Sequence, residues 1–268
     1  MKPTHHCFRS LLLCILTSAG ASAQDSPPPA TPPAAPVAAA EPAPAANPAA
    51  DLAAAAEKLA AATSYAWSQT TTFGNMGART ATGKKGSGGY LLVNMPGRDQ
   101  EIQVLVRKGK AAMKSDEGWA AVDPAAEGQG QGPGRFIARM VQNFQEPATQ
   151  AKNLVAKATD LKSENGSIHG TLGAEAATEL MSMGGFGRRG GGGGGGGGGT
   201  PPQVTGAAGK VSFAVSNGVL TGYEMTLTGN MNFNGEDRDV NRVTKVEFTG
   251  VGSTSFDIPE SAAGALAN

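Results

Sequence analysis

Cysteine and histidine are scarce in this sequence of 268 residues, which contains two cysteines and three histidines. Both cysteines, Cys7 and Cys14, lie in an N-terminal segment that we expect to be removed, so the remaining chain has no thiol for a disulfide or for nucleophilic catalysis. His169 is the single histidine beyond that segment, and no G-x-S-x-G motif occurs. These absences argue against hydrolases and metalloenzymes. We therefore expect no catalytic residue, no metal and no cofactor.

The sequence also lacks an excess of either charge, since 22 basic residues balance 22 acidic ones. Removal of the N-terminal segment takes Lys2 and Arg9 with it and leaves a small acidic excess. A chain of this balance has no general attraction to nucleic acid or to an anionic membrane surface. We expect no nucleic-acid partner.

The N-terminal segment has the pattern of a secretory signal peptide, over residues 1–23. Lys2 and Arg9 precede the apolar run Leu11–Leu16, and Ala21-Ser22-Ala23 forms a small-x-small cleavage site before Gln24. The run is too short to span a membrane comfortably. The mature chain is expected to be periplasmic or secreted and soluble. Lipidation at Cys14 is the less favoured alternative, because Leu12 and Leu13 match a lipoprotein signal poorly.

The sequence has two low-complexity segments, one before the expected domain at 51–268 and one within it. Residues 24–50 consist almost wholly of Pro and Ala, which favours a solvated, semi-rigid spacer before a helix capped by Asp51. A second segment at about 184–203 includes ten consecutive glycines, Gly190–Gly199. Glycine loses the most backbone entropy on ordering and has no side chain to bury, so we expect a disordered insertion within the domain.

Most of the remaining chain alternates between apolar and polar residues, as strands of a half-buried sheet do. A long hairpin is predicted over Lys210–Gly229, because Asn217-Gly218 suits a type I′ turn. Further strands are predicted at 64–73, 88–96, 101–108, 110–115, 118–123, 158–163, 166–172, 244–250 and 253–259, and those at 158–163 and 166–172 form another hairpin around Glu164-Asn165-Gly166. Helices are predicted from about 136 to 158 and over Ala174–Met183. The fold class is therefore α+β, with a curved antiparallel sheet of about ten strands wrapped over a helical layer.

Residues Asn230–Asp239 have the oxygen-rich spacing that begins a calcium-binding loop. The twelfth position, however, is Asn241, where such a loop needs a bidentate glutamate, and no flanking helices are apparent. We interpret the segment as a polar connection between two strands.

Aromatic residues are few for so large a sheet, and together they make up 5% of the chain. Such a sheet must cover its apolar face with helices or leave part of it concave and open. The residues that we expect to line an apolar cavity are Tyr65, Trp67, Trp119, Phe213 and Tyr223. The alternative is that they fill an ordinary closed core.

In its order of elements the chain resembles the half-barrel proteins of the bacterial cell envelope of the LolA/LolB and LppX/LprG type. The resemblance rests on a Tyr-x-Trp strand at Tyr65, a V-x-F-x-V-x-N-G hairpin at Val211 and the closing Phe256-Asp257-Ile258-Pro259. It implies a curved sheet over helices that encloses a cavity for an acyl chain, and so a monomeric carrier of a lipid or a lipidated polypeptide. It is also compatible with peripheral contact with membrane-anchored partners. The alternative is a protein-binding or sensor module with a closed core.

Overall fold

The computed structural model describes residues 47–74, 77–97, 100–122, 137, 144–183, 203–233 and 236–267. All of them belong to one compact unit, Ala45–Asn268. The predicted signal peptide and almost all of the predicted glycine-rich insertion lie outside the described residues, so these stay predictions.

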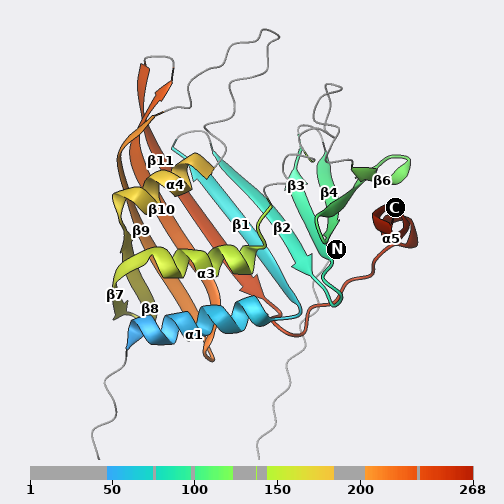
Figure 1. Ribbon diagram of the computed structural model, residues 1–268, viewed down its shortest axis with the longest axis horizontal. Coiled ribbons are helices and arrows are strands. Elements are labelled where there is room, and N and C mark those ends of the chain that lie inside the picture. Colours follow the sequence, from blue (N-terminus) through green and yellow to red (C-terminus); the bar gives the residue numbers. More distant parts are fainter. Residues whose placement is uncertain are drawn as a thin grey trace, which may run out of the picture. The chain divides into compact units, whose positions relative to one another are not determined.

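The described strands form a single antiparallel sheet of eleven strands, in the order β6-β5-β4-β3-β2-β1-β11-β10-β9-β8-β7 (Figure 1). Strands β1 to β6 follow one another as one meander and β7 to β11 as a second, and the pairing of β1 with β11 joins the two. The strands are β1 Tyr65–Phe73, β2 Ala78–Lys85, β3 Leu91–Pro96, β4 Glu101–Arg107, β5 Lys110–Ser115, β6 Gly118–Val122, β7 Ala158–Glu164, β8 Ser167–Leu172, β9 Val204–Ser216, β10 Val219–Phe233 and β11 Glu236–Thr249.

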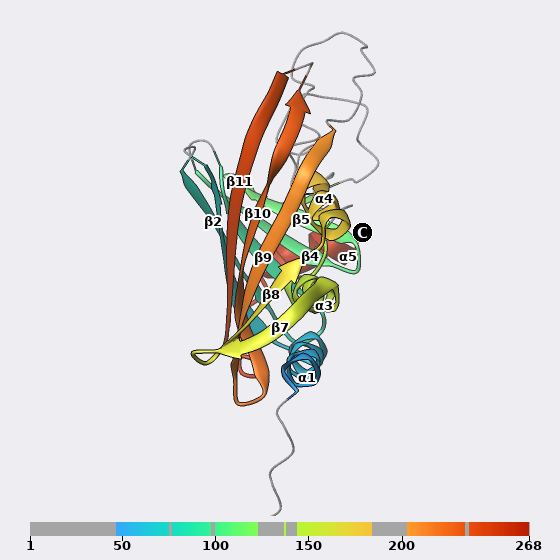
Figure 2. The same cartoon turned by 90° about the vertical axis from the view of Figure 1, so that its left-hand side faces the viewer.

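Four helices flank the sheet among the described residues. They are α1 Pro48–Ala61, α3 Pro147–Lys157, α4 Ala174–Met183 and α5 Glu260–Ala267. Figure 2 shows α1, α3 and α4 stacked along one side of strands β7 to β11. The predicted α+β class, with a curved antiparallel sheet over a helical layer, is confirmed, and the sheet has eleven strands where about ten were expected.

The predicted hairpin turns are confirmed by their backbone angles. Asn217 and Gly218 have φ of 52° and 68°, and Asn165 and Gly166 have φ of 50° and 78°. Positive φ at both central residues is what a type I′ turn requires, and asparagine and glycine accept it at the least steric cost. These turns connect β9 to β10 and β7 to β8, so local sequence sets the register of both hairpins.

The start of α1 differs from the sequence prediction. Asn47, and not Asp51, caps the helix, because its Oδ1 atom accepts a hydrogen bond from the backbone N–H of Ala50 over 3.3 Å. Pro48 occupies the first turn, where its missing N–H is not needed. Asp51 lies in that turn, where its negative charge favours the positive end of the helix dipole. The predicted apolar face is confirmed, since Leu52, Ala55, Ala56 and Leu59 are all buried.

Three strand predictions were wrong. β2 was missed, because its sequence ARTATGKK has no large apolar residue. Residues 253–259 form no strand. The segment 230–239 is mostly strand and not a connection, since β10 runs to Phe233 and β11 starts at Glu236. The segment is rich in polar residues, so its alternation of buried and exposed positions, in which Met231 is buried, was not recognised.

The sheet has a buried side chain layer on each face. We call the face that carries Tyr65, Val104 and Phe213, covered by α1, α3 and α4, the inner face, and the other the outer face. The main core lies on the inner face and also includes Ile137. A smaller core on the outer face joins Leu105 and Ala112 to Ala262 and Leu266 of α5. The alternation of β4 therefore serves two cores, with Val104 and Val106 in one and Leu105 in the other.

Candidate ligand-binding face

Four of the five predicted cavity residues lie together on the inner face. Tyr65 and Phe213 are fully buried, and Trp67 and Tyr223 are nearly so. The Phe213 and Tyr223 rings are 6.4 Å apart, and the Tyr65 ring meets Phe248 edge-on at 5.7 Å. Trp119 is not with them, because the structure places it on the outer face against the core under α5. Strand β6 presents alternate residues to opposite faces, and the sequence alone did not say which face was which.

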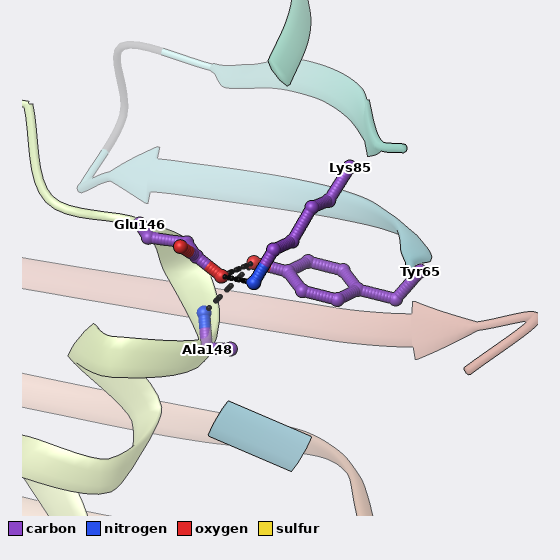
Figure 3. A network of polar contacts seen from close by, with 4 residues as sticks. All are labelled: Tyr65, Lys85, Glu146 and Ala148. Carbon is purple, nitrogen blue, oxygen red and sulfur yellow. Dashed lines mark hydrogen bonds and ion pairs between the residues drawn. The ribbon is translucent and has the colours of Figure 1, made fainter. Parts of the chain in front are cut away.

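Tyr65 is the centre of a polar network at the edge of the inner face (Figure 3). Its hydroxyl donates to Glu146 Oε1 over 2.9 Å and accepts the backbone N–H of Ala148 over 3.4 Å. Lys85 Nζ donates to the same carboxylate oxygen over 2.6 Å. Burial raises the pKa of Tyr65 well above its ordinary value, and the negative charge of Glu146 raises it further. The Tyr65 hydroxyl therefore stays a donor and fixes the start of α3 against β1 and β2.

Trp67 occupies the inner face directly above a glycine of the neighbouring strand. Gly83 is its partner in β2, and a Cβ atom at Gly83 would lie 2.6 Å from Trp67 Nε1 and 2.5 Å from the carbonyl oxygen of Leu92. The absence of a side chain there lets the indole approach the backbone of β2 closely. Trp67 Nε1 is buried and has no hydrogen-bond partner in the part of the chain that the structure describes.

A hollow of about 220 Å³ opens at the end of the inner face near this network. Its apolar wall is formed by Leu91 of β3, Val106 of β4 and Phe144, and its rim carries Arg107, Lys108 and Glu146. A second hollow of about 400 Å³, lined by Thr80, Pro96, Gly97, Gln100 and Glu101, is a shallow and more open depression. The first combines an apolar wall with a few charged groups, as small-molecule sites do.

Two functional candidates were missed by the sequence analysis, Glu146 and Arg242. Arg242 lies on β11 in register with Leu227 and Phe73, on the inner face, and 6% of it is exposed. The sequence contains the signal, because Arg242 alternates in phase with Thr244, Val246 and Phe248. It was overlooked because β11 was predicted to begin at Thr244.

The alternative chemistries considered for the sequence can be placed in the structure. His169 is exposed on β8, opposite Lys162 and Ser212 of the adjacent strands. Within the described residues, no group of three or more His, Cys, Asp or Glu side chains is arranged to hold a metal ion. Nor does any helix in this part of the chain have the length and apolar character needed to cross a membrane.

Two solved structures resemble this chain in fold. LprF from Mycobacterium bovis is 13% identical, with a TM-score of 0.41, and the match covers 80% of this chain and 96% of LprF. A LolA superfamily protein from Nitrosomonas europaea is 10% identical, with a TM-score of 0.28, and the match covers 81% of this chain and 96% of that one. No protein-family model and no curated protein matches the sequence.

Proposed function

We propose that this chain is an exported binding protein that holds the acyl chain of a lipid or of a lipidated polypeptide against its inner face. The observation that carries the proposal is the unequal cover of that face by helices α1, α3, α4 and α5, the helices with described bounds. Helices α1 and α4 pack mainly on β7, β9 and β10, whereas α5 packs on the outer face of β4 to β6. The apolar inner face nevertheless continues across β3 and β4 through Leu91, Val93, Val104 and Val106.

The hollow beside Leu91 and Val106 gives this part of the face an opening to solvent. An acyl chain that entered there would exchange water for apolar wall, with a gain of about 0.8 kcal/mol for each methylene that it buries. Affinity should therefore increase with chain length and then level off when the space is filled. No titrating group or metal is needed for such binding, which agrees with the expectation of a carrier without cofactors.

The second candidate is a module with a closed core that binds a protein partner and no lipid. It is favoured by the burial of Val93 and Val104, which are 2% and 0% exposed. Residues buried to this degree already have protein neighbours on all sides. A ligand would then have to displace part of that packing before it could bind.

Displacement of a fluorescent fatty-acid analogue by saturated fatty acids of eight to eighteen carbons separates the two candidates. A carrier gives a rise in affinity with chain length followed by a plateau, and lipids extracted from the purified protein appear in mass spectra. No displacement at any length, together with no co-purified lipid, would rule out the carrier and favour the protein-binding module.

A pair of phenylalanine variants places the site. Phe144→Ala removes one wall of the hollow and should weaken binding of the longer acids roughly tenfold, because a large apolar contact is lost. Phe256→Ala is the matched control, since Phe256 is also partly buried but belongs to the outer core. Equal losses in both variants would mean that the hollow is not where the chain binds.

A further inference from the structure

Polar side chains are rare in the core, and two of them are neighbours on the inner face. Among the described residues, the buried polar or charged ones are Ser64, Arg242 and Thr244. Arg242 and Thr244 are two positions apart on β11, so their side chains lie on the same face. That face continues into Tyr223 of β10, whose partner in β11 is Val246. A cation and two hydroxyl groups are thus placed within one apolar surface.

Arg242 is buried without a negatively charged partner in the described part of the chain. Its Nη2 atom donates to the carbonyl oxygen of Leu180 in α4 over 2.6 Å, and no ion pair there includes it. Its Nε atom is buried and has no hydrogen-bond partner among the described residues. Burial lowers the pKa of Arg242 from its ordinary value, which reflects the cost of holding this charge away from water. A guanidinium has five N–H donors, so one carbonyl leaves most of its capacity unused.

The hydroxyl groups beside Arg242 are also available. Burial raises the pKa of Tyr223 to about 12, and the positive charge of Arg242 acts in the opposite direction. In the sheet Tyr223 is opposite Val246, four residues along β11 from Arg242 and on the same face. Neither the Tyr223 hydroxyl nor the Thr244 hydroxyl bonds to another described residue. Buried polar groups are normally satisfied, and of these three residues Arg242 is the one whose buried atom, Nε, has no partner in the described part of the chain, so this atom indicates a missing acceptor.

A purely structural role explains part of this arrangement. The carbonyl of Leu180 is among the last four of α4, and no basic residue lies in the last turn of that helix. Arg242 supplies a hydrogen bond and a positive charge to this end of the helix dipole. This role uses one N–H group and gives no reason for the free Nε atom or for the two hydroxyls. The adjacent inner-face positions in β1, Thr71 and Phe73, are partly exposed, so solvent reaches the neighbourhood of Arg242.

We propose that Arg242, with the hydroxyls of Tyr223 and Thr244, binds the anionic head group of the acyl ligand, either a carboxylate or a phosphate ester. The proposal rests on the proposed function, because an acyl chain on the inner face is what brings the anion to Arg242, which lies at the Phe73 end of β1 and not at the Tyr65 end, where the hollow opens. The proposal is supported by charge complementarity. A carboxylate or phosphate oxygen can accept hydrogen bonds from guanidinium and hydroxyl donors together, and its negative charge would pair with the positive charge of Arg242. The ligand class is therefore an anionic amphiphile and not a neutral lipid.

Three probes with the same sixteen-carbon chain test this with the full mature protein. Palmitate and hexadecyl phosphate should each displace a bound fluorescent analogue roughly tenfold to a hundredfold more strongly than hexadecanol, the range expected for hydrogen bonds to a charged partner. Arg242→Met should remove that preference. If the role of Arg242 were only structural, Arg242→Met would weaken the binding of all three probes by the same factor. Arg238→Met is the matched control, since Arg238 lies on the same strand but is largely exposed.

Tyr223→Phe and Thr244→Val keep the size of each side chain and test the site even if Arg242→Met does not fold. Each should reduce the ratio of anionic to neutral affinity and leave hexadecanol unchanged. An unchanged ratio in both, or equal binding of the three probes by the wild type, would overturn the head-group site and leave the carrier function in place. Displacement by inorganic phosphate alone at similar concentrations would also overturn it, because the site would then serve a free anion. Failure of all three amphiphiles would instead remove the proposed function.

Discussion

The hydroxyl of Tyr65 donates a hydrogen bond to Glu146 over 2.9 Å across 81 positions of sequence. The same hydroxyl accepts the backbone N–H of Ala148, so one atom of β1 satisfies a donor at the start of α3. Glu146 itself makes no side-chain capping bond to the helix, although it occupies the capping position. Tyr65, in strand β1, therefore accepts the N–H bond at the start of α3 that a capping residue next to the helix would normally accept.

Tyr65→Phe should lower the free energy of unfolding by roughly 1 to 3 kcal/mol. It removes a hydrogen bond to a charged group and leaves the Ala148 N–H without its acceptor. Urea denaturation measures the change. Tyr90→Phe is the control, because Tyr90 also bonds a charged residue, Arg107, but lies partly exposed on the outer face. A loss in Tyr65→Phe no larger than in this control would show that the network does not hold α3.

Gly83→Ala should be destabilising by roughly 1 to 3 kcal/mol, because the new methyl group would overlap Trp67 and the Leu92 carbonyl. The indole must move, so the emission of Trp67 should change, and a Trp119→Phe background isolates that signal. Gly173→Ala serves as the control, since a Cβ atom there meets nothing within 4 Å. An unaltered emission spectrum in Gly83→Ala would contradict the close packing of Trp67 on the sheet.

Local signals in the sequence predicted the hairpins, because their turns depend on two adjacent residues. Asn217-Gly218 and Asn165-Gly166 both have the positive φ that a type I′ turn requires. β2 carries no such signal. It is held between β1 and β3 by backbone pairing. A glycine is needed at position 83 because Trp67, a residue of another strand, leaves no space for a side chain there. Tertiary contacts of this kind are not encoded in a window of neighbouring residues.

The candidate site was predictable in part for the same reason. Alternation placed Tyr65 and Trp67 on one face of a strand, and the structure agrees. Nothing in the sequence of β6 connects Trp119 with α5, so its place on the outer face could not be deduced. Arg242 was hidden because a charged residue in a polar stretch is normally exposed, and its burial depends on α4 crossing above it.

Cleavage after Ala23 remains a prediction, based on the small-x-small site that follows the apolar run. The intact mass and N-terminal peptide of protein purified from an exporting host should show Gln24 as the first residue. Ala23→Pro should retain the precursor and is the control for the site. A mature chain that begins with acylated Cys14 would contradict this prediction and indicate a membrane-anchored protein.

Tyr223 makes the stability of the fold sensitive to alkaline pH. Burial raises its pKa in the folded protein to about 12, whereas the unfolded chain releases the proton near 10.0. Above pH 10 the unfolded state therefore binds fewer protons than the folded state, and stability falls as the pH rises towards 12. The loss attributable to this one residue is on the order of 2 kcal/mol. Below pH 10 the protonated Tyr223 hydroxyl makes its full contribution to the free energy of unfolding.

Urea midpoints measured at intervals from pH 8 to pH 12 for wild type and Tyr223→Phe isolate this contribution. The variant should be the less pH-sensitive of the two, so that the difference between their free energies of unfolding narrows or reverses as the pH rises. Thr244→Val removes a neighbouring hydroxyl that does not titrate, and it should follow the pH dependence of the wild type. Parallel curves for wild type and Tyr223→Phe would mean that the hydroxyl is solvated. The inner face would then be open to water at Tyr223. Water would screen the charge of Arg242, and no bound anion would be needed to do so.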